Sequence, residues 1–260
     1  MQASRRKRLF DLTVAVLGAV VWVPVLVLCA LSILILEGRP VFYASSRRVG
    51  QRVIQMVKFR TMVRDAEKIY NRQTVPVSNS VRFLNTPPDC PLYTRIGRLI
   101  ESLALTEIPQ FLHVLKGDMS IVGNRPLPEN VIAALAEHFP GLHNRFLTPA
   151  GMAGPVQLIG RDELSDGDRL MLESTYCSVA ATHYAWGMDF MILWQTVLIS
   201  LRLKPAFSVE EVRRRLTKYA HGREDVLAVE RRRMHAREQG TSWRGERRRA
   251  YAQGQGHISA

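Results

Sequence analysis

The longest apolar stretch of the chain covers residues 12–36 and contains no ionisable residue other than Cys29. A helix needs about 20 apolar residues to cross the hydrocarbon core of a bilayer, and this stretch is longer than that. Pro24 lies near its middle, where a proline removes a helix hydrogen bond and bends the helix. The pattern therefore predicts a bent, membrane-embedded helix at the N-terminus.

Basic residues flank this stretch on both sides and bear on its topology. Positions 5–8 are all basic, and Arg39, Arg47, Arg48 and Arg52 follow the stretch. A straight span would put one basic group on the outer face, against the tendency of positive charge to stay inside. We therefore predict a re-entrant helix that keeps both groups on one side, with a straight span as the alternative. A cleaved signal peptide fits less well, because the stretch is long and no small-x-small site closes it.

Beyond the membrane stretch, short periodic segments alternate with turns. Residues 40–43 and 53–57 are typical of extended chain, and residues 72–93 contain several prolines and predict an irregular loop. Helical spacing of apolar residues predicts the helices 63–71, 96–103, 128–139, 166–180 and 188–203. The prediction is an α+β fold, with a compact, mostly helical body, a small sheet and interfacial helices. The last helix can lie in the interfacial plane or be buried in the core.

Another helix is predicted after Leu105, with Thr106 as its N-cap and Glu107 in its first turn. Gly117 ends that helix. A glutamate in a first turn usually compensates the helix dipole, so the pattern alone does not make Glu107 catalytic.

The segment 121–126 reads as a strand-like turn that carries a glycine and an arginine. Gly123 is expected to adopt a backbone conformation that other residues avoid. Arg125, beside that turn, is well placed for a phosphate.

Charge and cysteine usage narrow the classes of partner. The chain has 36 Lys and Arg against 23 Asp and Glu, a formal charge of +13. Such an excess favours nucleic acid, an anionic leaflet or a phosphorylated substrate as partner. The three cysteines are widely spaced without a Cys-x-x-Cys pattern, which supports neither a disulfide framework nor a zinc site and fits a cytoplasm-facing location.

An arginine-rich segment closes the chain, with Arg triplets at 213–215, 231–233 and 247–249. It predicts a solvated helix followed by disorder, or a contact with anionic lipid. No nucleic-acid-binding fold accompanies it, so nucleic acid is not expected as a partner. The predicted organisation is a membrane-embedded part at 1–39, a catalytic body at 40–207 and a basic helix and tail at 208–260.

The order of these pieces resembles the monotopic phosphoglycosyl transferases, a bacterial sugar transferase family that moves a sugar phosphate from a nucleotide sugar to a polyprenyl phosphate. The resemblance spans residues 6–201 and leaves out only the arginine-rich tail. Each motif alone is weak, but their common order is specific. The carriers, besides the Pro24 helix, are the segments 7–11, 48–50, 58–62, 94–98, 107–110, 116–120, 123–126, 151–154 and 160–161.

The resemblance implies chemistry for the positions that match. Similar enzymes use an Asp-Glu dyad, in which the aspartate attacks the β-phosphate of a UDP-sugar and the glutamate helps to hold Mg²⁺. Glu107 matches the glutamate, so it is expected to be catalytic and a magnesium ligand. The basic residues expected near the phosphates, where a guanidinium can bind two oxygens, are Lys58, Arg60, Arg95, Arg98 and Arg125.

The resemblance also implies partners and a location. The donor would be a nucleotide sugar, the acceptor a polyprenyl phosphate, and the surface the cytoplasmic face of a bacterial inner membrane, including its anionic lipids. The reaction would begin assembly of a polysaccharide or another glycoconjugate.

Thr106 departs from the family pattern, since it stands where the nucleophilic aspartate is expected. Glu107 can itself be the nucleophile, or Thr106 can attack with Glu107 or Asp118 as its base. Donor and acceptor can also react directly while bound together. Two further alternatives are an inactive membrane scaffold of the same fold and a transferase with a different lipid acceptor or phospho-donor.

Overall fold

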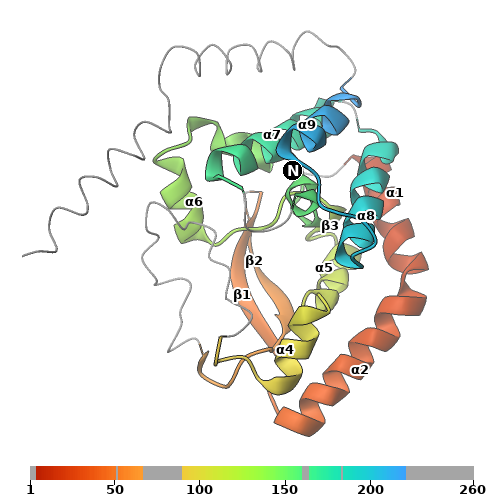
Figure 1. The fold of residues 1–260 in the computed structure, drawn as a ribbon, viewed down its shortest axis with the longest axis vertical. Coiled ribbons are helices and arrows are strands. Elements are labelled where there is room, and N and C mark those ends of the chain that lie inside the picture. Colours follow the sequence, from red (N-terminus) through yellow and green to blue (C-terminus); the bar gives the residue numbers. More distant parts are fainter. Residues whose placement is uncertain (1–3, 51, 67–89, 160–163, 183, 221–260) are drawn as a thin grey trace, which may run out of the picture. The chain divides into compact units, whose positions relative to one another are not determined.

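The structure is a computed structural model of the chain, and it describes residues 4–50, 52–66, 90–159, 164–182 and 184–220. The chain divides into two units, Met1–Tyr219 and Ala220–Ala260. The first unit combines helices with two small sheets of two strands each (Figure 1). This mixture of helices and short strands agrees with the predicted α+β class.

Two consecutive helices, α1 (Arg5–Leu17) and α2 (Ala19–Glu37), form the N-terminal part. Gly18 separates the two helices, and the chain changes direction between them (Figure 1). Pro24 lies inside α2, so a membrane bend at Pro24 stays a prediction. Among the described residues, α2 is the one helix that is long and apolar enough to cross a membrane, with a mean hydropathy of 2.9.

One face of α2 packs against the body of the protein. Cys29 and Ile33 of α2 form a buried cluster with Phe59 and Ile100, while only 17% of the most apolar window of α2 is buried. The helix is therefore anchored along one face and exposes apolar side chains over most of its surface.

A β-hairpin follows α2. β1 (Phe42–Val49) pairs antiparallel with β2 (Arg52–Phe59). Gly50 in the connecting turn has a φ of 60°, a conformation that glycine adopts without steric cost. The predicted strand at 53–57 is confirmed, and the extended chain predicted at 40–43 is the beginning of a longer strand.

The predicted helix at 96–103 is confirmed as α4 (Arg95–Ser102), which Thr94 caps by accepting a hydrogen bond from the Gly97 N–H. A Cβ on Gly97 would lie 2.0 Å from the carbonyl oxygen of Thr61, so α4 can approach that backbone only with glycine here. Most of the predicted helix 63–71 and loop 72–93 lies outside the described residues.

The predicted helix after Leu105 starts later than expected. It begins as the 3₁₀ turn η1 (Ile108–Gln110) and continues as α5 (Phe111–Lys116). Glu107 takes the N-cap position, so the prediction of Thr106 as N-cap is wrong. The reason is that the Thr106 hydroxyl makes a different hydrogen bond, described below. Gly117 ends α5 in the left-handed conformation, as predicted.

A short parallel pair joins two distant parts of the chain, β3 (Ser120–Val122) and β4 (Gly151–Ala153). A Cβ on Gly151 would lie 2.1 Å from the backbone nitrogen of Gly123. The φ of Gly123 is not positive, so the conformational reason predicted for this glycine is wrong. The residue is instead needed because the two chain segments approach closely.

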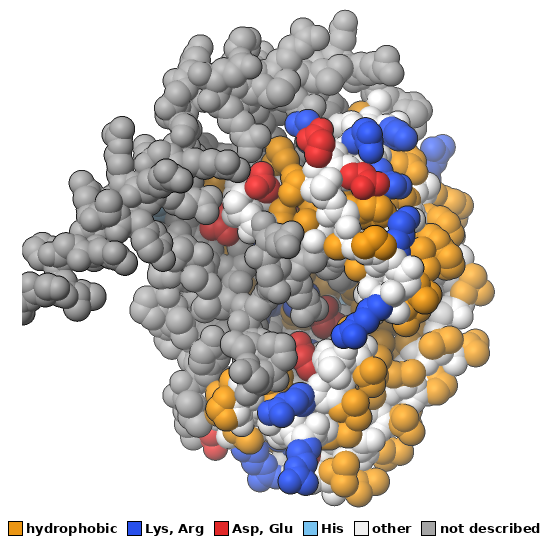
Figure 2. Space-filling view, viewed as in Figure 1, with side chains coloured by type: hydrophobic (Ala, Val, Ile, Leu, Met, Phe, Trp, Pro, Cys, Tyr) orange, Lys and Arg blue, Asp and Glu red, His pale blue; other side chains and the backbone are white. Residues whose placement is uncertain are grey.

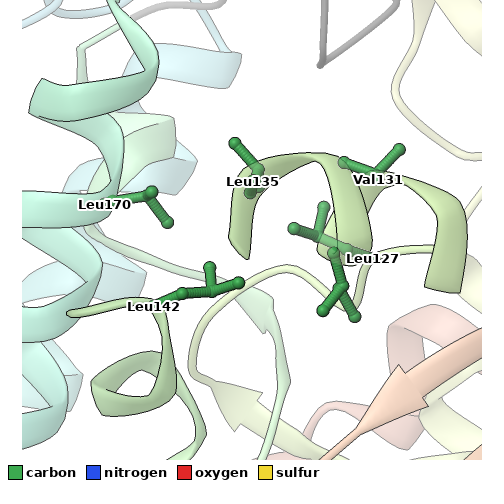
Figure 3. Packing of buried hydrophobic residues seen from close by; sticks show 6 residues of the cluster. Leu127, Val131, Leu135, Leu142 and Leu170 are labelled. Atoms are coloured by element: carbon green, nitrogen blue, oxygen red, sulfur yellow. The ribbon is translucent and has the colours of Figure 1, made fainter. Parts of the chain in front are cut away.

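The remaining helices confirm the predictions at 128–139, 166–180 and 188–203. Side chains of the chain segment between β3 and α7 (Asp166–Thr182) gather into a buried cluster with Leu170 of α7, and Figure 3 shows Leu127, Val131, Leu135, Leu142 and Leu170 as neighbours in this cluster. The elements are α6 (Glu129–Ala136), η2 (Pro140–Phe146), η3 (Pro155–Leu158), α7 (Asp166–Thr182), α8 (Trp186–Ser200) and α9 (Val209–Thr217).

Helix α8 has one buried and one exposed apolar face. Met188 and Ile192 are fully buried, whereas Trp186, Phe190 and Trp194 are about half exposed. Figure 2 shows hydrophobic side chains gathered along the side of the molecule where Figure 1 places α2 and α8. The predicted burial in the core therefore holds for one face of this helix, and its placement in the interfacial plane stays a prediction.

Candidate functional site

The turn after α4 sets the position of the residues that follow. Ala104 has a φ of 57°, its N–H donates to the Glu101 carbonyl at 3.0 Å, and the Leu105 N–H donates to the Ile100 carbonyl at 2.9 Å. These two bonds define a Schellman motif. The side chains of Leu105 and Ile100 belong to the cluster that packs on α2, which is the hydrophobic contact that usually accompanies this motif.

The Schellman motif turns the chain back, so that Thr106 meets the end of α4. The Thr106 hydroxyl donates to Glu101 Oε2 at 2.7 Å, and its carbonyl accepts from the Phe59 N–H at 3.1 Å. The partner of this hydroxyl is therefore neither Glu107 nor Asp118, the two bases considered from the sequence. Sequence reasoning missed Glu101, because residues five apart are not neighbours on a regular helix.

Glu107 and Arg125 lie together, as the resemblance implied. Arg125 Nη2 donates to Glu107 Oε1, and the two side chains are 46% and 27% exposed. The negative charge of Glu107, and to a smaller degree that of Glu101, raises the pKa of Arg125. Two carboxylates and a guanidinium thus form an accessible group around Thr106, which we call the 101–125 site (Glu101, Thr106, Glu107 and Arg125).

A buried ion pair holds the backbone of Arg125 in place. Arg145 Nη2 donates to the Arg125 carbonyl at 2.9 Å, and Arg145 Nε donates to Glu173 Oε2 at 2.8 Å. The Arg145 and Glu173 side chains are each 2% exposed. A small pocket beside Arg125 is lined by Arg48, Gly50, Asn124, Arg125, Pro126, Arg145, Phe146, Thr148 and Ala150. Three arginines and no acidic residue line this pocket.

Asp118 lies in the turn between α5 and β3 and contacts other partners. Its Oδ2 is 3.3 Å from His113 Nδ1 and 3.4 Å from Lys116 Nζ. His113 Nε2 accepts from the Val57 N–H, so Nδ1 carries the proton that is donated to Asp118. Burial raises the pKa of Asp118, but the His113 hydrogen bond and the Lys116 charge outweigh it and hold the pKa below its ordinary value. These contacts describe a residue that stabilises the turn.

Arg60 is buried and bound to backbone. Its Nε donates to the Pro40 carbonyl at 2.6 Å, and its Nη2 donates to the Gly38 carbonyl at 3.1 Å and lies 3.6 Å from Glu37 Oε2. The guanidinium therefore ties the end of β2 to the end of α2. These contacts give no support to the phosphate-binding role that the resemblance implied for Arg60.

The other basic candidates lie nearer the surface. Lys58 Nζ lies over the Tyr43 ring, 5.3 Å from its centroid, in the hairpin. Arg95 and Arg98 are exposed on α4, and neither has a hydrogen-bond or ion-pair partner within the described part of the chain. The structure brings Glu107 and Arg125 together, next to Thr106.

The chain belongs to the family described as "Bacterial sugar transferase", which it matches over residues 2–203. It is similar to the "Exopolysaccharide production protein ExoY" of Sinorhizobium fredii, with 28% identity over 74% of this chain and 83% of that protein. It is also similar to the "Uncharacterized sugar transferase EpsL" of Bacillus subtilis, with 32% identity over 74% of this chain and 85% of that protein.

Several relatives are longer than this chain. The "UDP-galactose-lipid carrier transferase" of Erwinia amylovora is 30% identical over 77% of this chain, but the match covers only 41% of that protein. For the "Undecaprenyl-phosphate glucose phosphotransferase" of Komagataeibacter xylinus the identity is 32% and the covered share is 37%. The chain thus spans most of the shorter relatives and less than half of the longer ones.

Proposed function

We propose that this protein transfers a sugar phosphate from a UDP-sugar to a polyprenyl phosphate and so begins assembly of a polysaccharide or another glycoconjugate. The observation that carries the proposal is the Glu107–Arg125 pair, which sits in the segments that match the sugar transferase family. Relatives named "Undecaprenyl-phosphate galactose phosphotransferase" and "Undecaprenyl-phosphate glucose phosphotransferase" support the donor and acceptor classes.

The 101–125 site supplies what phosphoryl transfer requires of a protein. This chemistry depends mainly on positioning and on neutralising the charge of the transferred group. The exposed guanidinium of Arg125 can bind two phosphate oxygens, and the pocket beside it extends the positive surface. The exposed side chains of Arg95 and Arg98, together with Lys58, are proposed to attract the donor diphosphate or the lipid phosphate.

The residues of the site fit a magnesium ion that is shared with the substrate. No group of three or more His, Cys, Asp or Glu side chains suited to a metal occurs in the part of the chain that the structure describes. Mg²⁺ does not need such a group, because it is usually held by one or two carboxylates together with substrate phosphates and water. Glu107 would be the protein ligand, and the ion would neutralise charge on the diphosphate.

We also propose that the protein rests on the cytoplasmic leaflet, with residues 1–39 embedded as a re-entrant element. The exposed apolar surface of α2 and the exposed aromatic side chains of α8 support a membrane contact on one side of the molecule. The body 40–207 would then present the 101–125 site to the headgroup region, and the basic tail 208–260 would contact anionic lipid. Labelling of single cysteines placed at positions 4 and 39 in intact cells tests this, because a straight span puts only one of them inside.

A transfer assay tests the proposed function. Membranes containing the protein are incubated with a panel of radiolabelled UDP-sugars and polyprenyl phosphate, and both UMP and lipid-linked product are measured. Glu107→Gln is expected to reduce turnover at least about 10³-fold, because it removes a charge that is needed only where the diphosphate reacts. Glu137→Gln is the matched control, because Glu137 is exposed at the C-cap of α6, and this variant should behave as the parent protein. Absence of both products with every donor in the parent protein would favour the inactive scaffold.

A further inference from the structure

The two carboxylate oxygens of Glu101 have different surroundings. Oε2 accepts the hydroxyl hydrogen of Thr106 at 2.7 Å. Oε1 has no hydrogen-bond or ion-pair partner among the residues that the structure describes. The Glu101 residue is partly exposed to solvent. Glu101 therefore presents one fixed and one accessible carboxylate oxygen.

The other two candidate nucleophiles are less suited to attack a phosphorus atom. Glu107 shares its Oε1 with the Arg125 guanidinium, which draws on the electron pairs of that oxygen. Thr106 is buried, with only 6% of the residue exposed. A threonine hydroxyl is also a weak nucleophile until a base removes its proton. A carboxylate nucleophile such as the side chain of Glu101 does not depend on a neighbouring base for its activation.

We infer that Glu101 is the nucleophile of the transfer, positioned by the hydrogen bond from Thr106. This inference rests on the proposed function and identifies how its site works. The carboxylate that the family pattern places at position 106 is supplied here from position 101, because the Schellman motif at Ala104 folds α4 back onto Thr106. The carboxylate pair is thus Glu101 and Glu107, and Arg125 donates a hydrogen bond to Glu107.

The transfer then proceeds in two balanced steps. In the first, Glu101 Oε1 forms a bond to the sugar-bearing phosphorus of the UDP-sugar, and the bond from that phosphorus to the bridging oxygen breaks. UMP leaves with the electron pair of that bond. In the second, an oxygen of the lipid phosphate forms a bond to the same phosphorus, and the acyl-phosphate bond breaks to restore the Glu101 carboxylate. No proton has to be moved by the protein in either step.

Trapping of the adduct is the first test. The full-length protein in nanodiscs is mixed with the UDP-sugar that supports turnover, without polyprenyl phosphate, and examined by intact mass and peptide mapping. The expected result is one phosphosugar on the peptide that contains Glu101, with a burst of UMP of up to one equivalent. Hydroxylamine should release the adduct and leave a hydroxamate at Glu101, because an acyl phosphate reacts with hydroxylamine and a phosphothreonine does not.

Matched variants separate the nucleophile from the positioning residue. Glu101→Gln keeps an acceptor for the Thr106 hydroxyl but removes the nucleophile, so adduct formation and turnover should fall about 10³-fold or more. Thr106→Val removes the hydrogen bond but keeps the carboxylate, so the adduct should still form at Glu101 with kcat lower by about tenfold. Thr196→Val, in α8, removes a hydroxyl that bonds only within its own helix and should leave kcat unchanged.

An exchange of the two side chains gives a positive test. Thr106→Asp alone places two carboxylates side by side, which raises the pKa of one of them and should not restore fast chemistry by itself. Glu101→Gln/Thr106→Asp removes that repulsion and offers an amide to the new carboxylate. The double variant is expected to be at least about tenfold more active than Glu101→Gln, with the adduct now at position 106.

The outcomes distinguish this inference from the proposed function. Lipid-linked product with an adduct at Thr106 or Glu107, or unchanged turnover in Glu101→Gln, overturns the inference and leaves the function in place. Product without any adduct or UMP burst shows direct transfer and overturns it equally. Absence of product in the parent protein with every donor overturns both.

Discussion

Lys7 and Asp189 form an ion pair that is buried between the first helix and α8. Lys7 Nζ lies 2.7 Å from Asp189 Oδ2, and the two side chains are 3% and 0% exposed. Lys7 Nζ also donates to the Val122 carbonyl at 2.7 Å, which ties the N-terminal helix to β3. This lysine therefore belongs to the interior of the protein and is not one of the surface charges that flank the membrane stretch.

The pair predicts an uneven response to substitution. Asp189→Asn leaves the Lys7 charge buried without its counterion, so the free energy of unfolding should fall by about 3–5 kcal/mol. Lys7→Met/Asp189→Asn removes both charges of this pair and should lose less than Asp189→Asn alone. Thermal unfolding in nanodiscs measures the stability of both variants. Arg213→Gln, which breaks the surface pair with Glu210, is the control and should lower the free energy of unfolding by less than about 1 kcal/mol. A double variant less stable than Asp189→Asn contradicts this account.

The contacts of Arg60 predict that a substitution at this position changes the stability of the protein but not its binding of substrate. Arg60→Lys keeps the charge but cannot reach the carbonyls of both Pro40 and Gly38, so the free energy of unfolding should fall by about 1–3 kcal/mol. The KM for the UDP-sugar should stay within about twofold, because the guanidinium faces the backbone.

Arg125→Lys provides the contrast for Arg60→Lys. It should lower kcat/KM by about tenfold or more with little loss of stability, since it removes an exposed bidentate donor. A large rise in KM for Arg60→Lys would instead indicate that Arg60 binds the substrate phosphates.

The left-handed conformation of Ala104 predicts that a substitution can stabilise the turn between α4 and Thr106. A left-handed conformation costs a residue with a Cβ about 1–2 kcal/mol, whereas glycine adopts it freely. Because glycine also loses more backbone entropy on folding, Ala104→Gly should raise the free energy of unfolding by no more than about 1 kcal/mol. That corresponds to a rise in Tm of roughly 2–4 °C in a chain of this size.

Ala104→Val is the matched opposite of Ala104→Gly. A β-branched residue opposes the left-handed conformation, so this variant should lower Tm and also reduce turnover by displacing Thr106 from Glu101. A variant with a lower Tm and full activity would show that the Schellman motif does not position the site.

The helices of the body followed from the sequence because their apolar periodicity is local. The segment at 96–103 shows one apolar face, the segment at 188–203 is apolar on its buried and its exposed side, and Gly117 gives an unambiguous helix end. The resemblance to the family predicted that Glu107 and Arg125 lie close together, although 18 positions separate them along the chain.

The contacts that the sequence did not show depend on tertiary structure. The Thr106–Glu101 hydrogen bond depends on a turn in which Ala104 adopts the left-handed conformation. Glycine is the usual residue in that conformation, so the sequence contains no residue that predicts this turn. The parallel β3–β4 pair is three residues long on each side, too short for an alternating pattern. Arg60 was assigned by position in a motif, and only the backbone carbonyls around it reveal its structural use.

Asp118 gives a prediction that separates catalysis from stability by pH. Its pKa in the folded protein lies below the ordinary value of 3.8, because the His113 hydrogen bond and the Lys116 charge outweigh the effect of burial. A depressed carboxyl pKa stabilises the fold above the unfolded value and loses this contribution as the pH falls through the folded value. Asp118→Asn should therefore be less stable than the parent protein at pH 7, and the difference should shrink below about pH 4.

The same variant tests whether Asp118 takes part in the reaction. If it only stabilises the turn, Asp118→Asn should keep kcat within about threefold at a temperature well below its Tm. Thermal unfolding from pH 3 to pH 7, combined with UMP release at pH 7, measures both properties on one preparation. A fall in kcat of more than about a hundredfold with unchanged stability would make Asp118 a base or metal ligand, and its contact with His113 would then be part of the chemistry.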